Sequence, residues 1–375
     1  MVGNTFLVGA FGPILPEIAR TRGLADWQLG VVAGAFGFAR MAGAAPAGIL
    51  AGRHVALSLV LSPFFLAAGL VCLVVAPSFT LLVLGRVLMG IGHTLLMVGG
   101  ITALLQDDGG AGGSFRLNLF EFSGMLGILG GLTLMGLLPG HWPWTLSLPV
   151  AAAPLLVGPL LGRALLRKFP PTPAVAPAVR GAEAPARAAG PSGERVFWLM
   201  LVVGMLMALA WSSVSQFLIP LRGTREFGLG RGGVSILLAL AQIVDLIVLL
   251  PVGWLADRVG RVPVLGAVLA VLALGTFGAG LGGFPLFVAG CACFGMGLAG
   301  WMLPLGVIRE HVGMTGLAWR TGLYRVGMDS AVFLGPVVSG LLGERLAGFF
   351  VALVGAGALV VAGRLTFRPL PRRVA

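Results

Sequence analysis

Charged side chains interrupt several long apolar stretches of this sequence. They are Arg40, Arg86, Glu121, Asp245, Arg325 and Asp329. A charge at the depth of bilayer hydrocarbon is costly unless it is paired or lies in a water-filled cavity, so each of these residues is a functional candidate. The carboxyl groups are suited to binding and releasing a proton, and the guanidinium groups to holding an anion or a neighbouring carboxylate.

A second group of charges lies in the segment GWLADRVGR, which begins at Gly253. This segment places Asp257, Arg258 and Arg261 close together directly after an apolar run. A similar segment, GILAGRH from Gly48, occurs 205 positions earlier but contains no aspartate. The two segments indicate an internal repeat, and the missing acid indicates that its two copies do not act alike.

The composition decides which elements position these charges. Of the 375 residues, 58% are hydrophobic and only 10% are charged, far below the quarter usual in soluble domains. Apolar stretches of about 20 residues, long enough to cross a bilayer as a helix, recur along the whole chain. Runs such as LLVLGRVLMGIGHTLLMVGG do not alternate between apolar and polar residues, which argues against a transmembrane β-barrel.

We therefore predict an all-α membrane protein with about twelve transmembrane helices. Their expected ranges are 3–19, 27–50, 55–76, 79–104, 116–138, 144–165, 196–220, 232–256, 262–281, 284–308, 320–343 and 346–366. The first apolar run lacks a basic leader and a cleavage site, so it is read as the first of these helices and not as a signal peptide.

A Pro-, Ala- and Gly-rich segment divides the chain into two similar halves. It covers residues 166–195 and cannot bury a core, so we predict a flexible linker between two six-helix bundles, residues 1–165 and 196–375. A shift of 205 positions lays the stretch from Phe79 on the stretch from Phe284, as it does for the two loop segments. Parallel half-repeats are a known plan of transporters, so the bundles are predicted to be pseudo-symmetric.

The formal charge of +12 is distributed as in a membrane protein. Of the 25 Lys and Arg residues, 16 lie on the side of the predicted linker and six on the opposite side. Basic residues are retained on the cytoplasmic side, so the linker and both termini are predicted to be cytoplasmic and the chain to be a multi-pass protein of the bacterial inner membrane. The charge therefore does not indicate a nucleic-acid partner, and we expect a monomer in contact with membrane lipid.

The sequence shows neither the cysteine spacing of a metal site nor the motifs of an enzyme. Cys72, Cys291 and Cys293 lie inside apolar runs with the wrong spacing for a zinc site or a disulfide framework. No Gly-rich phosphate loop, nucleophile motif or catalytic pair of acids appears. We predict no enzyme, no metal and no cofactor beyond a proton gradient.

Several of these segments together resemble the major facilitator superfamily. The GWLADRVGR segment matches its loop signature, and Arg86, Gly90 and Gly92 match its signature on the fourth helix. The segments YRVGMDSAVFLGP and FGFARMAGAAPAGILAGR are similar to those of bacterial drug and metabolite members. The resemblance covers essentially the whole chain and implies two six-helix bundles around a central cavity, working by alternating access.

The resemblance also implies a cytoplasmic latch. It places Asp257 beside the start of the fifth helix, near Arg116, while Gly253, Arg258 and Arg261 complete the loop. A carboxylate at a helix N-terminus is stabilised by the helix dipole. The alternative is that the arginines only set the topology. In the first loop Gly52 replaces the aspartate, and the fifth helix lacks the proline of the family's antiporter signature.

The buried charges are assigned to two roles. Because the second and eleventh helices should be neighbours, Arg40 is expected to pair with Asp329, and Arg325 joins them from four residues away on the same helix face. This set is either a switchable triad or a static ion pair. Asp245 takes the repeat position of Arg40, and Asp245 and Glu121 are the candidates for proton coupling.

The substrate cavity of such a protein would be lined by further polar and aromatic residues. Arg86 and His93 share one face of the fourth helix, although a buried histidine bonded to the backbone is the simpler interpretation of His93. The remaining candidates for the cavity wall are Trp211, Ser212, Ser215, Gln216, Trp301 and Tyr324.

The sequence thus predicts a secondary transporter of a small-molecule substrate that works by alternating access. The first hypothesis is proton-coupled export of small organic or amphipathic solutes, because of the membrane acids and the apolar cavity helices. The alternative is uptake or exchange of an organic anion, because of the buried arginines. A non-transporting membrane receptor or scaffold is the third hypothesis, disfavoured by the lack of a sizeable soluble domain.

Overall fold

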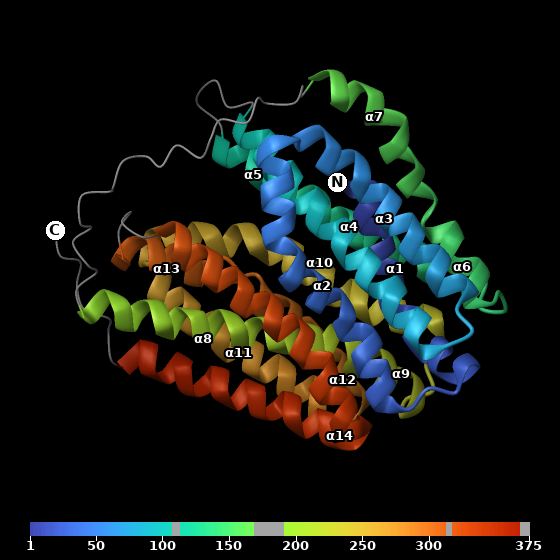
Figure 1. Ribbon diagram of the computed structural model, residues 1–375. Coiled ribbons are helices and arrows are strands. Elements are labelled where there is room, and N and C mark those ends of the chain that lie inside the picture. Colours follow the sequence, from blue (N-terminus) through green and yellow to red (C-terminus); the bar gives the residue numbers. More distant parts are fainter. Residues whose placement is uncertain (107–112, 169–190, 313–316, 368–375) are drawn as a thin grey trace. The chain divides into compact units, whose positions relative to one another are not determined.

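The computed structural model describes residues 1–106, 113–168, 191–312 and 317–367 (Figure 1). Every regular element among these residues is a helix, so the predicted all-α fold is confirmed. The elements are α1 (Val2–Arg22), α2 (Asp26–Arg53), α3 (Val55–Val75), α4 (Phe79–Gln106), α5 (Gly113–Leu137), α6 (Trp144–Ala151), η1 (Ala153–Leu156), α7 (Val157–Lys168), α8 (Pro191–Ser213), η2 (Val214–Leu218), α9 (Ile219–Arg225), α10 (Arg231–Val259), α11 (Arg261–Leu281), α12 (Phe284–Leu298), α13 (Leu303–Val312) and α14 (Leu317–Phe367).

The predicted number of about twelve transmembrane helices depends on how one bent helix pair and one very long helix are counted. Ten described helices are long and apolar enough to cross a membrane, and eleven if the pair bent by 42° at Ala151 and Ala153 is one span. The span Trp319–Leu365 is 47 residues long and contains Gly343 in a non-helical conformation, with φ 74° and ψ 167°. Only glycine adopts this conformation without strain, and it splits α14 into two segments. Counting these separately brings eleven spans to twelve.

The helices form two compact units. The first contains α1 to α7, most of α9 and the beginning of α10 as far as Ala239, and the second contains α8, η2, the rest of α10 and α11 to α14. Residues 220–239, which follow the predicted linker in sequence, thus pack with the first half of the chain. The predicted boundaries at residues 165 and 196 stay a prediction.

Glycines at equivalent repeat positions set the closest helix contacts in both units. A Cβ atom on Gly90 of α4 would lie 2.6 Å from the carbonyl oxygen of Phe36 in α2. A Cβ atom on Gly295 of α12 would lie 2.1 Å from the carbonyl oxygen of Ala241 in α10. Both residues of the second contact are 205 positions after those of the first, so the repeat seen in the sequence recurs in the packing. Small residues allow membrane helices to approach this closely.

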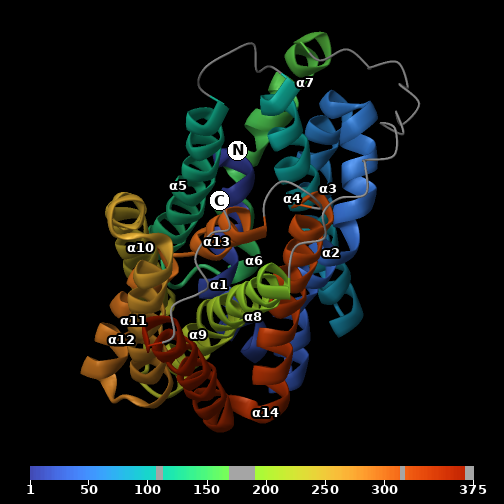
Figure 2. The same ribbon diagram turned by 90° about the vertical axis from the view of Figure 1, so that its left-hand side faces the viewer.

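Other pairs follow the same rule. The helices α3 and α4 lie side by side, as do α11 and α12 (Figures 1 and 2). Gly85 of α4 faces Gly69 of α3, and Gly290 of α12 faces Gly278 of α11. These tight contacts provide rigid scaffolds for the functional side chains described next.

Two helices of the second unit are irregular at the level of their tryptophans. The chain leaves α8 through η2, a five-residue π-helix that follows Trp211, and α12 ends at Leu298 before Trp301 and the start of α13. Single π-helical turns are frequent at functional sites. These breaks and the buried charges therefore mark the candidate site.

Candidate functional site

Asp245 is a buried carboxyl group in the middle of α10, within the second unit. Asp245 is 8% exposed, and its Oδ2 accepts one hydrogen bond, from Gln242 Nε2 at 3.4 Å. Its Oδ1 is buried without any hydrogen-bond partner. The carboxyl group follows Ala241 by one turn and is thereby held by the tight contact of α10 with α12.

The predicted ion pair within α14 is present. Arg325 Nε lies 3.6 Å from Asp329 Oδ2, and the two side chains differ in exposure, 44% for the arginine and 4% for the aspartate. Tyr324, next to the arginine, is 5% exposed and packs against Gly204 of α8. Its hydroxyl group is buried without a hydrogen-bond partner, so Tyr324 fills a helix contact and does not line an open space. The predicted pairing of Asp329 with Arg40 stays a prediction.

The polar residues of the seventh predicted helix separate into two sets. Ser212 is completely buried, and its Oγ donates to the carbonyl oxygen of Ala331 at 3.2 Å, which ties α8 to α14. Its prediction as a cavity residue is corrected accordingly, because the hydroxyl group is used for helix packing. Ser215 and Gln216 are half-buried, and the Ser215 hydroxyl donates to the carbonyl oxygen of Trp211.

Trp211 and Trp301 meet at the two helix breaks. Both are half-buried, and their ring centroids are 6.2 Å apart in an edge-to-face arrangement. Aromatic pairs of this geometry are favourable beyond the area that they bury. The pair offers an aromatic surface, and the half-buried Ser215 and Gln216 follow Trp211 by about one turn along the chain.

In the first unit Arg86 is fully enclosed. It is 1% exposed, its Cζ lies 3.7 Å from the ring centroid of Phe11, and its Nε donates to the carbonyl oxygen of Val32 at 3.3 Å. No ion pair holds it among the described residues, so the predicted partnership with a carboxylate is not seen. Aromatic faces and backbone carbonyls stabilise its charge instead.

Three candidate residues of the first unit lie close to the ring of Phe36. Arg86 lies 4.9 Å and Arg40 5.9 Å from its centroid, and the His93 ring is 5.3 Å away. His93 is buried, whereas Arg40 is half-buried, as is Glu121 on α5. The role of Glu121 as a second candidate for proton coupling stays a prediction.

The predicted latch segment is anchored within the second unit by one of its arginines. Arg261 Nη1 lies 3.2 Å from Glu310 Oε1 and donates to the carbonyl oxygen of Gly306 at 3.0 Å, which ties the start of α11 to α13. Asp257 and Arg258 are exposed, as is Gly253, and the Arg258 guanidinium lies 4.0 Å from the centroid of the Trp254 ring. The side chain of Arg116 lies outside the described residues, so the latch itself stays a prediction.

A cluster that the sequence analysis missed lies at the end of the first unit where α1 ends and α10 begins. Arg231 Nε and Nη2 donate to Glu17 Oε1 and Oε2 at 2.7 and 2.6 Å. Arg231 also donates to the Ser147 hydroxyl group and to the carbonyl oxygen of Trp142. The available signal was Glu17 itself, an acid near the end of an otherwise apolar first helix.

Two further ion pairs involve α9, which precedes this part of α10. Arg225 Nη1 lies 2.8 Å from Asp26 Oδ1. Arg222 Nη2 donates to Glu226 Oε1 at 2.8 Å, and this bond lowers the pKa of the Glu226 carboxyl group. Ion pairs therefore hold the chain both before and after the connection between α9 and α10.

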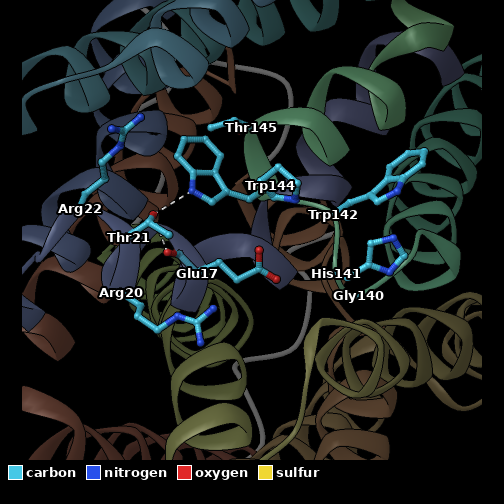
Figure 3. A pocket seen from close by; sticks show the side chains of 10 residues that line it. Glu17, Arg20, Thr21, Arg22, Gly140, His141, Trp142, Trp144 and Thr145 are labelled. Carbon is cyan, nitrogen blue, oxygen red and sulfur yellow. Dashed lines mark hydrogen bonds between the residues drawn. The ribbon is translucent and has the colours of Figure 1, made fainter.

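A polar pocket of ≈ 380 Å³ opens beside Glu17. Its walls are the last turns of α1 and the loop before α6, and they include Arg20, Arg22 and His141. Figure 3 shows Arg22 alongside Trp144, while His141 and Trp142 lie on the other side of Glu17. The indole nitrogen of Trp144 donates to Thr21 Oγ1 at 2.9 Å, which fastens one wall of the pocket to α1.

Comparison with known proteins gives a family match over the whole chain. The model of the Major Facilitator Superfamily matches residues 1–230 and again residues 217–375. Monocarboxylate transporter 11 of Mus musculus is 35% identical over 159 residues, which are 39% of this chain and 35% of the mouse protein. The protein of the same name from Homo sapiens is 34% identical over 159 residues, 39% of this chain and 33% of the human protein. The match spans about a third of the length of these curated relatives.

Solved structures agree in fold. The peptide transporter POT in complex with sulfate superposes with a TM-score of 0.78 at 14% identity, covering 97% of this chain and 92% of that chain. The nucleoside transporter NupG gives a TM-score of 0.71 at 16% identity, covering 97% and 96% of the two chains. At these identities the similarity concerns the fold.

Proposed function

Because the chain belongs to the Major Facilitator Superfamily and is a secondary transporter, we propose that it couples a proton to the movement of a small organic carboxylate. Family membership excludes the predicted alternative of a non-transporting receptor or scaffold. The proposal keeps the direction predicted from the sequence, export across a bacterial inner membrane by alternating access.

The observation that carries proton coupling is the environment of Asp245. A carboxylate buried in apolar surroundings is costly unless a cation or several donors compensate its charge. Asp245 has one long hydrogen bond, from Gln242, and no ion pair among the described residues. Binding a proton removes the uncompensated charge, and the conformational change of a transporter can expose the group to water so that the proton leaves.

The substrate class is supported by charge and by the relatives. Arg40 and Arg325 are half-buried in predicted membrane spans, where a guanidinium group is suited to bidentate contact with a carboxylate. The mouse and human relatives are named monocarboxylate transporters. A small organic acid therefore takes first place, ahead of the broader class of organic solutes.

One observation favours a second candidate, the export of amphipathic solutes. The half-buried rings of Trp211 and Trp301 form an apolar surface, and the polar residues Ser215 and Gln216 follow Trp211 by about one turn in the chain. Such a surface suits a flat apolar group with a polar edge, as in many amphipathic compounds. The experiment below separates the two by including a neutral aromatic solute.

The test is transport by the purified full chain in liposomes that contain a pH-sensitive dye. We expect labelled L-lactate to accumulate in response to an imposed proton gradient, with a matching change of internal pH, above the background of protein-free liposomes. Asp245→Asn should abolish this accumulation while lactate exchange between equal concentrations persists, because the amide copies the shape of the protonated acid. Reversing the gradient in oriented liposomes tests the direction.

Asp257→Asn is the matched control, because it removes the same group from the exposed end of the same helix. It should retain gradient-driven accumulation because it leaves Asp245 in place, whatever effect loss of the predicted latch has on the rate. Equal accumulation by Asp245→Asn and by the unmodified protein would remove Asp245 from the mechanism. Transport of a neutral aromatic solute in place of any carboxylate would favour the second candidate.

A further inference from the structure

The ion pair between Glu17 and Arg231 is unequally exposed. The side chain of Arg231 is 2% exposed and that of Glu17 is 21% exposed. Glu17 lines the adjoining pocket and Arg231 does not, so a solute in the pocket meets the carboxylate before the guanidinium group.

Arg231 fastens the first turn of α10 to two other elements of the first unit. Each of its three guanidinium nitrogens donates a hydrogen bond, to Glu17 of α1, to Ser147 of α6 and to the backbone of Trp142 before α6. Gly136 of α5 lies against the same part of α10, where its Cβ would be 2.9 Å from the Cβ of Ser235. Releasing Arg231 would free this whole end of α10.

Breaking the pair outright is unfavourable. A guanidinium group as buried as that of Arg231 would lose its counter-ion, and an uncompensated buried charge is strongly destabilising. Exchange of one carboxylate for another avoids this cost, because the two parallel donors of an arginine fit any carboxylate. The pair can therefore open readily only if a second anion takes the place of Glu17.

The adjoining pocket has the charge and size to deliver such an anion. Arg20 and Arg22 line it and are exposed, and its single acid, Glu17, is already neutralised by Arg231. The excess of positive charge attracts anions and raises their local concentration. A volume of ≈ 380 Å³ lies within the range of small-molecule sites, of which a molecule such as lactate fills only a part.

We propose that this vestibule pocket, formed by Glu17, Arg20, Arg22 and the loop from Gly140 to Thr145, binds a small organic carboxylate that replaces Glu17 on Arg231. The exchange frees Glu17 from Arg231 and thereby releases α10 from α1. The bound carboxylate would thus loosen this part of the first unit. The choice of a carboxylate rests on the proposed function, whereas the exchange is tested without transport.

The experiment measures how closely α5 and α10 approach each other in the detergent-solubilised full chain. Gly136→Cys and Ser235→Cys are introduced after the three native cysteines have been replaced, and the rate of disulfide formation is followed with an added oxidant. Sodium L-lactate should slow the reaction severalfold. Neutral lactamide, and sodium chloride at equal ionic strength, should not, which separates exchange from salt screening.

Variants locate the effect. Arg20→Gln with Arg22→Gln should abolish the response to lactate, because the charges that gather the anion are lost. Arg53→Gln with Arg345→Gln removes two exposed arginines elsewhere and should keep it. In case the two cysteines disturb folding, Ser235→Cys alone, at a residue only 2% exposed, should react faster with a maleimide when lactate is present.

The outcomes are distinct. No response to lactate beyond that to chloride, or an equal response after loss of Arg20 and Arg22, would overturn the vestibule proposal even if lactate is transported. A lactate response that depends on both arginines, in a protein that transports no carboxylate, would support the vestibule and contradict the proposed function.

Discussion

Gly295 of α12 touches α10 at Ala241, where a Cβ atom on the glycine would lie 2.1 Å from the alanine carbonyl oxygen. Asp245, the carboxyl group proposed to carry the proton, is one turn further along α10. In the first unit Arg40 is likewise one turn beyond Phe36, whose carbonyl oxygen faces Gly90. The two halves thus use one packing device to hold opposite charges at equivalent positions.

The first prediction concerns this contact. Gly295→Ala should destabilise the protein by about 1–3 kcal/mol, because the added methyl group forces α12 away from α10. Gly90→Ala should have a similar effect. The measurement is the thermal unfolding midpoint in detergent, and Gly253→Ala is the control, since nothing lies within 4 Å of a Cβ atom there. Equal midpoints for all three variants would contradict the packing account.

The second prediction concerns the ion pair of α14. Arg325→Ala should be more destabilising than Arg325→Ala combined with Asp329→Asn, by roughly 1 kcal/mol, because the single change removes the cation beside a buried carboxylate. Arg345→Ala, an exposed arginine of the same helix, should leave the midpoint unchanged. If the double variant is the less stable one, the aspartate is held by other groups and the pair has little importance.

The third prediction separates the two arginines of the GWLADRVGR segment. Arg261→Ala should lower the unfolding free energy by about 1 kcal/mol, because it loses a hydrogen bond and a half-exposed ion pair to α13. Arg258→Ala should have a smaller effect, since its side chain is exposed on Trp254. Denaturant titration of both variants gives the comparison, and a larger loss for Arg258→Ala would reverse the assignment.

The fourth prediction tests the topology with two exposed histidines. The excess of basic residues predicts that His54 lies on the cytoplasmic side and His141 on the opposite side. In a background without the native cysteines, an impermeant thiol reagent added to whole cells should label His141→Cys and not His54→Cys. Permeabilised cells provide the control, in which both should react. Labelling of position 54 alone in whole cells would invert the orientation.

The sequence by itself determined the helices, their repeat and the pair of charges within α14. Each of these is visible in the order of residues along the chain: an apolar run long enough to cross hydrocarbon, the offset of 205 residues, or the four-residue spacing of Arg325 and Asp329. Such patterns persist whatever the helices pack against. The aspartate in the middle of α10 was recognised as unusual for the same reason, since an ionisable group in an apolar run stands out without knowledge of its surroundings.

Only the tertiary structure decided which side chains serve function and which serve packing. Ser212 appeared suited to a cavity, yet it bonds to Ala331, which is 119 residues away in the sequence. Glu17 and Arg231 are 214 residues apart, and nothing in their local sequence connects them. Contacts of this kind depend on how helices from distant segments are rotated and paired. That arrangement follows from close packing at glycines such as Gly90 and Gly295, a sum of many small contacts that no single stretch of sequence contains.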